Sequence, residues 1–136
     1  MADYVDFAPE HLDAIIAICR AEGWPSYPED PARALRALTA PGIRTVVAVR
    51  EGEVAGFATA GSDGEIQAYL ILIGVAASHR RKGVGRRLVE EVHARTGARR
   101  MDLLSTEGAD GFYASFPHAR KEPGFRIYPG ARGDGA

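Results

Sequence analysis

The chain has 136 residues, of which 46% are hydrophobic and 26% charged, and this suits a single soluble domain with one core. The formal net charge is −1, so overall charge gives no reason to expect nucleic acid or an anionic membrane as a partner. Cys19 is the only cysteine, which excludes an internal disulfide and suits a reducing compartment. Because we see no signal-peptide pattern and no apolar run near the roughly 20 residues of a membrane span, we expect a cytoplasmic protein.

The first third of the sequence predicts a short strand and two helices. Residues 4–7 suit the strand, and residues 9–22 place apolar side chains at helical spacing after an early proline. Residues 23–28 contain two prolines and predict a loop that carries the only tryptophan. Asp30 precedes a proline and suits the N-cap of a second helix over residues 31–38.

The middle of the sequence is rich in strand signals. Residues 45–49 and 54–60 flank a Glu-Gly turn, which predicts a β-hairpin. Residues 66–75 form a longer strand that is apolar nearly throughout from Tyr69. Continuous apolarity predicts a central strand that is buried on both faces.

The last third alternates between helix and strand. Residues 83–96 carry an apolar helical stripe and are followed by a strand at 101–104, an order that predicts a parallel pair with the long strand. A short helix is expected at 109–116 and a last strand at 125–128. These elements predict one α+β domain over residues 1–128, with a mixed, mostly antiparallel central sheet and helices on both faces. Residues 129–136 are expected to form a disordered tail.

The most informative stretch lies between the long strand and the helix that follows it. There Arg80-Arg81-Lys82-Gly83-Val84-Gly85 places three cations before two glycines at a helix start. Such a start exposes backbone N–H groups and partial positive charge, which makes it a ready site for phosphate. The pattern is not a P-loop, and Leu88 stands where a dinucleotide fingerprint needs its third glycine. A phosphate-bearing cofactor is therefore predicted here, with a solvated basic turn as the alternative.

The same motif resembles the signature of the GCN5-related N-acetyltransferase (GNAT) family. That signature reads Arg or Gln, two residues, Gly, one residue, then Gly or Ala, and residues 80–85 fit it fully. The order of elements resembles the family from the first helix to Phe125. The resemblance implies a GNAT-like fold in which the parallel strands splay apart, acetyl-CoA as the cofactor, and transfer of its acetyl group to an amine.

The resemblance also implies where the cofactor binds. The pyrophosphate would rest on backbone N–H groups at the helix start, and the pantetheine arm would pair with the end of the long strand. The predicted cofactor-binding residues are Ile73, Gly74, Val75, Arg80, Arg81, Lys82, Gly83, Val84, Gly85 and Arg86. For Gly74 two interpretations stay open: a bulge that frees an N–H for the thioester carbonyl, or simple packing against a helix.

Phe112-Tyr113 resembles a Phe-Tyr pair of the family, in which the tyrosine often protonates the departing thiolate. Tyr113 is therefore the predicted catalytic acid, and a phenol that only packs the helix is the alternative. Many relatives carry a Glu or His as base on the central strand, but this strand has neither at its middle, and Glu65 stands only at its start. No base is assigned.

The acceptor side is predicted from aromatic and polar residues. Trp24 and Tyr27 lie in a proline-bounded loop that lines the acceptor site in relatives, although Trp24 could equally plug the edge of the core. Gln67 and Tyr69 share one strand face with Glu65 and would form a polar wall of the pocket. Surface carboxylates elsewhere are more often solvated than functional.

These features predict an acetyl-CoA-dependent N-acetyltransferase that acts on an amine of a small molecule by direct attack in a ternary complex. The alternatives are a protein N-terminus or lysine as acceptor, and a non-catalytic acyl-CoA-binding module, which the absent base would favour. No metal site is expected, because the four histidines show no ligand spacing. Neither nucleic acid nor a membrane is an expected partner, and a homodimer is left open.

Overall fold

The computed structural model of the chain describes residues 1–130. Residues 1–102 form one compact unit, and the chain from Leu103 onward forms a second. Five strands make up one sheet in the order β1-β2-β3-β4-β5, and their bounds are β1 Asp3–Asp6, β2 Ile43–Arg50, β3 Glu53–Ser62, β4 Gln67–Val75 and β5 Arg100–Asp102. The first four strands pair antiparallel, and β4 and β5 pair in parallel. The predicted mixed α+β sheet is confirmed.

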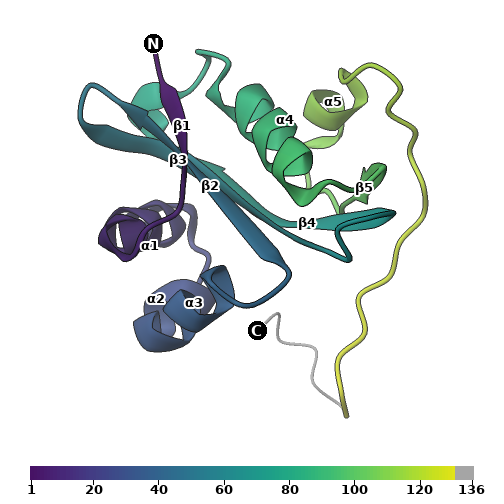
Figure 1. Ribbon diagram of the computed structural model, residues 1–136, viewed down its shortest axis with the longest axis horizontal. Coiled ribbons are helices and arrows are strands. Elements are labelled where there is room, and N and C mark those ends of the chain that lie inside the picture. Colours follow the sequence, from purple (N-terminus) through teal and green to yellow (C-terminus); the bar gives the residue numbers. More distant parts are fainter. Residues whose placement is uncertain (131–136) are drawn as a thin grey trace. The chain divides into compact units, whose positions relative to one another are not determined.

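Helices cover both faces of this sheet (Figure 1). The first unit contains η1 Pro9–His11, α1 Leu12–Glu22, α2 Ser26–Glu29, α3 Pro31–Leu38, η2 Ala77–His79 and α4 Val84–Thr96. Helices α1 and α3 pack against β2, β3 and β4 on one face, and α4 packs against the same strands on the other face. The apolar stripe of α4 is buried as its spacing predicts, through Val84, Leu88, Val89 and Val92.

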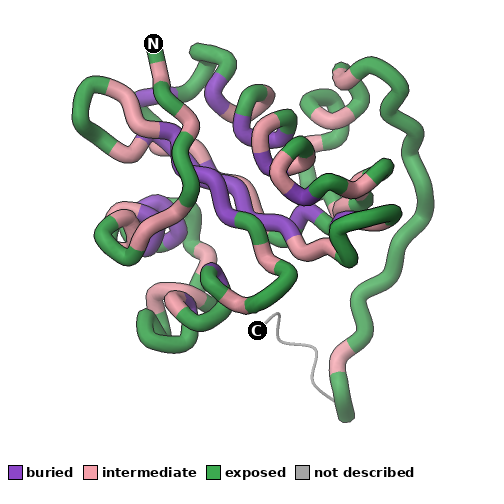
Figure 2. Tube along the Cα trace, in the orientation of Figure 1, coloured by how far each residue is buried: buried purple, intermediate pink, exposed green. Residues whose placement is uncertain are grey.

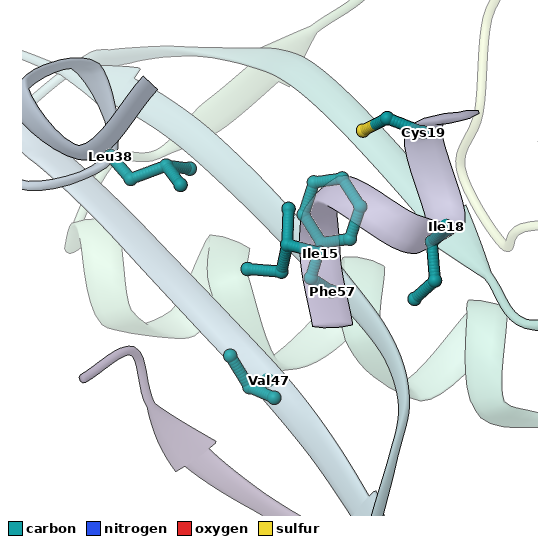
Figure 3. Packing of buried hydrophobic residues seen from close by; sticks show 6 residues of the cluster. All are labelled: Ile15, Ile18, Cys19, Leu38, Val47 and Phe57. Carbon is teal, nitrogen blue, oxygen red and sulfur yellow. The ribbon is translucent and has the colours of Figure 1, made fainter. Parts of the chain in front are cut away.

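The core lies on both faces of β3. Six consecutive residues of this strand, 55–60, are buried, and most of them are small enough to let helices approach from both sides (Figure 2). On the α1 face, Phe57 packs in a cluster with its partners from α1, α3 and β2 (Figure 3), which are Ile15, Ile18, Cys19, Leu38 and Val47. Cys19, the only cysteine, is 1% exposed and is therefore a core residue.

The prediction that β4 is buried on both faces is wrong. Tyr69 is 38% exposed and Ile71 is 46% exposed, both at alternate positions of the strand. The physical reason is the position of the helices, which centre on β3 rather than β4. The apolar run in β4 therefore marks a strand with one open face.

The segment predicted as a loop over residues 23–28 contains one helical turn, α2. Pro28 is compatible with this turn because it lies within the first turn, where a missing N–H costs no intrahelical hydrogen bond. The predicted cap of the next helix is confirmed, since the Asp30 carboxylate accepts a hydrogen bond from the backbone N–H of Arg33 at 3.1 Å.

The second unit contains one short helix, α5 Asp110–Ala114, which is shorter than the predicted 109–116. The strand predicted over residues 125–128 is wrong. Phe125 and Ile127 alternate as a strand would require, but they are 90% and 89% exposed, and the segment has no strand assignment. A strand exists only when a neighbour satisfies its backbone groups, and the alternating pattern alone supplies none. Residues 131–136 of the predicted tail lie outside the described residues.

Candidate active site

The segment between β4 and α4 has a backbone shaped for an anion. Residues 80–83, called the phosphate loop below, connect η2 to α4. Two of them adopt left-handed backbone conformations, Arg81 with φ of 63° and Gly83 with φ of 79°. A residue with a side chain rarely adopts this conformation, so it is a specific feature of the loop. Turns of this kind align successive backbone N–H groups into anion-binding concavities.

The phosphate loop leads into a helix N-terminus that is open to a ligand. Gly83 is the N-cap of α4, no side chain within residues 1–130 caps it, and its first turn contains no acidic residue. A Cβ atom added at Gly83 would meet no atom within 4 Å, so the space beside it is open. Partial positive charge at a helix N-terminus favours phosphate. The residues present therefore fit the pyrophosphate of a nucleotide cofactor.

The cations of the motif differ in their surroundings. Arg81 and Lys82 are exposed, Arg86 is half-buried, and Val84 points its side chain into the core. Exposed cations next to a helix N-terminus can add charge-assisted hydrogen bonds to phosphate oxygens. Arg81 and Lys82 are thus the side chains best placed for that role.

Arg80 is held by the protein itself. Its Nη2 donates to the carboxylate of Glu22 at the end of α1, and its Nε donates to the backbone carbonyl of Val75 at 3.3 Å. The sequence predicts Arg80 only as a cofactor-binding residue and gives no sign of Glu22, which lies 58 positions away. The first residue of the motif therefore connects the phosphate loop to both α1 and β4.

The pairing of β4 changes along its length. It pairs with β5 only at Gln67, Ala68 and Tyr69. Within residues 1–102, the following part of β4 has β3 as its only strand neighbour. The short ladder leaves one edge of residues 70–75 without a strand in this unit, which matches the expected splay of the parallel pair.

The structure places the bulge of β4 at Ile71 and not at Gly74. Leu70 and Leu72 pair with successive residues of β3, so Ile71 is the extra residue. At Gly74 a Cβ atom would lie 2.9 Å from Cγ2 of Ile18 and 3.0 Å from Cε1 of Phe57. Glycine is required there because side chains of α1 and β3 pack directly on the backbone. Of the two interpretations of Gly74, close packing holds and the bulge does not.

The two predicted acceptor residues near α1 belong to the edge of the core. Trp24 and Tyr27 are half-buried and pack against the cluster around Phe57. Cζ3 of Trp24 lies 3.3 Å from the position of a Cβ on Gly74. Burial, with a smaller contribution from Cys19, raises the pKa of Tyr27 to about 12, so its phenol stays protonated at neutral pH. Trp24 thus lies against the end of β4, where the cofactor arm is predicted.

The two predicted acceptor residues on β4 lie near its start. The side chain of Gln67 is engaged, because its Oε1 accepts from Arg100 and its Nε2 donates to the carbonyl of Ala68 at 2.8 Å. Tyr69 is exposed. Glu65 lies outside the strand, in a turn closed by the Asp63 carboxylate, which accepts its N–H at 2.7 Å. Three such backbone hydrogen bonds, led by that of Glu65, lower the pKa of Asp63. Glu65 is therefore a turn residue.

Tyr113 lies on α5 in the second unit. Its ring meets that of Phe112 edge to face, with centroids 4.9 Å apart, and Phe112 meets Phe116 in the same way at 5.3 Å. Burial raises the pKa of Tyr113. A phenol with a raised pKa keeps its proton at neutral pH, so Tyr113 is in the protonated form that a general acid needs.

A buried histidine precedes the phosphate loop. His79 is buried, its Nε2 lies 3.3 Å from a carboxylate oxygen of Glu53, and its Nδ1 has no hydrogen-bond partner among the described residues. The sequence marks His79 only as a residue without metal-ligand spacing. Its burial places it among the groups that fix the end of η2.

Two kinds of site are not found in the part of the chain that the structure describes. No three side chains of His, Cys, Asp or Glu gather there into a group that could hold a metal ion. None of its helices has both the length and the apolar character needed to cross a membrane.

Comparison with known families gives the class of the protein. The profile described as "Acetyltransferase (GNAT) family" matches residues 10–116, which include strands β2 to β5, the phosphate loop and α5. The chain belongs to this family. It is an acetyl-CoA-dependent N-acetyltransferase, and acetyl-CoA is its co-substrate.

Solved structures support the fold. The chain is similar to AAC(6')-Iy in complex with a bisubstrate analogue, with 21% identity, a TM-score of 0.72, and coverage of 94% of this chain and 99% of that one. An aminoglycoside acetyltransferase from an uncultured soil metagenomic sample gives 20% identity, a TM-score of 0.73, and coverage of 94% and 98%. A ribosomal-protein-alanine N-acetyltransferase from Brucella melitensis gives 15% identity, a TM-score of 0.73, and coverage of 96% of this chain and 100% of that one. No curated protein matches the chain by sequence.

Proposed function

We propose that this enzyme transfers the acetyl group of acetyl-CoA to an amine of a small molecule. The proposed binding of acetyl-CoA rests on one observation. The N-terminus of α4 has no side-chain cap among the described residues, and it follows a loop in which two residues have left-handed backbone conformations. Aromatic side chains at Trp24, Tyr27 and Tyr69 offer surfaces on which a small cationic or ring-bearing acceptor can stack. Two of the similar structures are described as aminoglycoside acetyltransferases, which supports an acceptor of this class.

Different parts of the chain bind the pyrophosphate, orient the pantetheine arm and donate a proton to the leaving group. Backbone N–H groups of the phosphate loop and the side chains of Arg81 and Lys82 bind the pyrophosphate. The end of β4 orients the pantetheine arm through its open backbone edge. Acetyl-CoA supplies a thioester whose carbonyl carbon a neutral amine attacks directly in a ternary complex, forming the C–N bond and releasing the thiolate. Tyr113 donates its Oη proton to that sulfur, the attacking nitrogen releases its extra proton to solvent, and Tyr113 regains a proton from solvent.

Calorimetric titration with acetyl-CoA tests the binding part. Gly83→Glu puts a carboxylate and a side chain where the pyrophosphate is expected, and we predict that affinity falls at least about 100-fold, or about 2.7 kcal/mol. Gly64→Glu is the matched control, because Gly64 also has a left-handed backbone, with φ of 81°, and a Cβ atom added there would meet only the carbonyl oxygen of Thr96, at an ordinary contact distance of 4.0 Å. Equal affinity of the two variants, or no binding by the folded wild-type enzyme, would contradict the proposed site.

The acid is tested with Tyr113→Phe. If Tyr113 protonates the thiolate, kcat falls by about 100-fold or more while the affinity for acetyl-CoA stays the same. Because burial raises the pKa of the phenol, the wild-type rate should hold until the pH rises above its usual value near 10 and then decline. Unchanged turnover in Tyr113→Phe would remove the assignment.

A second acceptor class is a protein N-terminus, favoured by the similarity to the ribosomal-protein-alanine N-acetyltransferase. A thiol-release assay with aminoglycosides, polyamines and amino acids beside short peptides separates the two. Turnover with peptides alone would replace the small-molecule proposal. Binding of acetyl-CoA without turnover of any amine would instead support a non-catalytic acyl-CoA-binding module.

A further inference from the structure

Arg80 connects the phosphate loop to the end of β4, five residues before it, and to the end of α1, which lies 58 positions away. Its guanidinium donates to the carboxylate of Glu22, the last residue of α1, and to the carbonyl of Val75, the last residue of β4. Its own backbone belongs to the phosphate loop. An arginine has five donors in a fixed planar fork, so one side chain can hold several acceptors in a set relative position.

The same helix end also fixes Trp24. Gly23 ends α1 in a left-handed conformation with φ of 78°, and the N–H of Trp24 donates to the carbonyl of Cys19 at 2.9 Å. The indole then packs over Gly74, one residue before the Val75 carbonyl that Arg80 contacts. These contacts therefore form a closed ring. The ring runs from Glu22 along the chain to Trp24, then to the end of β4, and returns through Arg80 to Glu22.

We infer that Glu22 is a positioning residue that, through Arg80, couples occupancy of the phosphate loop to the placement of Trp24 on the acceptor side. A pyrophosphate on the loop brings a second anion to a guanidinium that already serves Glu22. The two anions compete for the donors of Arg80, so binding of the pyrophosphate changes the contact between Arg80 and Glu22 at the end of α1. This in turn changes how the Trp24 indole packs. This inference rests on the proposed function, since it takes the nucleotide half of acetyl-CoA as the ligand of the loop.

Trp24 is the only tryptophan, so fluorescence excited beyond the absorption of the five tyrosines reports on it alone. The probe is 3′-phospho-ADP, which carries the pyrophosphate of coenzyme A but no pantetheine arm to touch the indole. We expect this probe to change the fluorescence or the acrylamide quenching of the wild-type enzyme. Glu22→Gln should reduce that change by more than half. Glu90→Gln removes the same charge from an exposed position on α4 and should respond like the wild type.

A double-variant comparison identifies the route. Arg80→Gln keeps a residue that the family signature allows but ends the ion pair. If the pair carries the coupling, Glu22→Gln has no further effect on the response once Arg80 is Gln. Because the Glu22 and Arg80 side chains are 30% and 51% exposed, affinity for the probe should change by about fivefold at most.

The outcomes separate the two proposals. A wild-type response that persists unchanged in a folded Glu22→Gln, or probe binding without any response of Trp24, overturns the coupling and leaves the acetyltransferase function intact. No heat of binding for either 3′-phospho-ADP or acetyl-CoA overturns the proposed site itself. Thermal melts of each variant show that the compared proteins are folded.

Discussion

The two ends of α4 are built in opposite ways. At its N-terminus the helix has a glycine as N-cap, no side-chain cap among the described residues and exposed cations in the preceding loop. At its C-terminus Gly97 closes the helix with φ of 75°, and the hydroxyl of Thr96 accepts the N–H of Ala98 at 3.2 Å. Sequence preferences for helix stability would place an acid or a capping side chain at the first end, and neither is there. This contrast supports the proposal that the N-terminus of α4 binds the cofactor, while its C-terminus is closed by contacts within the fold.

Arg95 shows how firmly the C-terminal end is held. It donates to the carboxylates of Asp6 at 2.8 Å and Glu91 at 2.7 Å, and to the carbonyl of Tyr4 at 3.0 Å. Arg87 lies over the ring of Tyr4, 4.8 Å from its centre, and also pairs with Glu91. These contacts tie α4 to the edge strand β1. Because α4 is held to β1 in this way, the uncapped backbone groups at its N-terminus do not reflect a loosely held helix, which supports their proposed role in binding.

The largest effect is expected at the open end. Lys82→Glu replaces an exposed cation of the phosphate loop, proposed to bind the pyrophosphate, with an anion, and we expect affinity for acetyl-CoA to fall about 30-fold, or about 2 kcal/mol, with little change in the melting temperature. Arg99→Glu makes the same charge change beyond the closed end. The helix separates the two sites by roughly 20 Å, which exceeds the screening length at physiological salt. Calorimetry of both variants checks this, and a similar loss in Arg99→Glu would mean that net charge alone governs binding.

The next effect is expected at the closed end. Arg95→Ala removes the side-chain contacts with Asp6, Glu91 and Tyr4 and part of a half-buried stem, so the free energy of unfolding should fall by about 1.5 kcal/mol, or about 5 °C in melting temperature. Affinity for acetyl-CoA should stay as in the wild type. Arg36→Ala, at an exposed position of α3, is the control for loss of an arginine. Weaker acetyl-CoA binding without lower stability would show that the two ends do not divide their roles.

Local features of this contrast were predictable from the sequence, because they depend on neighbours along the chain. Gly83 and Gly97 mark the two ends of α4, and the spacing of apolar residues such as Leu88 predicts its buried face. The parallel pairing of β4 and β5 follows from the strand-helix-strand order. Periodicity, turn chemistry and connection rules all act within a few tens of residues.

The partners of the polar side chains were not predictable. Nothing in the sequence pairs Arg80 with Glu22 or Arg95 with Asp6, since these contacts depend on how α1, α4 and β1 are placed in the sheet. The bulge at Ile71 depends likewise on the register between β3 and β4, which an apolar run does not encode. The prediction of a strand over residues 125–128 was wrong for a related reason. An alternating pattern indicates strand propensity, but it does not provide the neighbouring strand that a sheet requires.

The smallest expected effect concerns pH at the closed end. Hydrogen bonds from Arg95 and then Arg87 lower the pKa of Glu91, so the folded state binds fewer protons than the unfolded state. Its contribution to stability is therefore complete above the usual pKa of a glutamate and is lost as the pH falls through the lowered value.

We expect Glu91→Gln to lower stability at pH 7 by less than about 1 kcal/mol, because the pairs are partly exposed. The difference from the wild type should shrink between pH 5 and pH 3 in thermal melts, with Glu90→Gln as the control on the same helix. Affinity for acetyl-CoA at pH 7 should not change, because the ion-pair partners of Glu91, Arg87 and Arg95, lie outside the phosphate loop. A constant stability difference between Glu91→Gln and the wild type at every pH would mean that Glu91 stabilises α4 through packing and not through its charge. Charge at Glu91 would then play no part in the difference between the two ends of the helix.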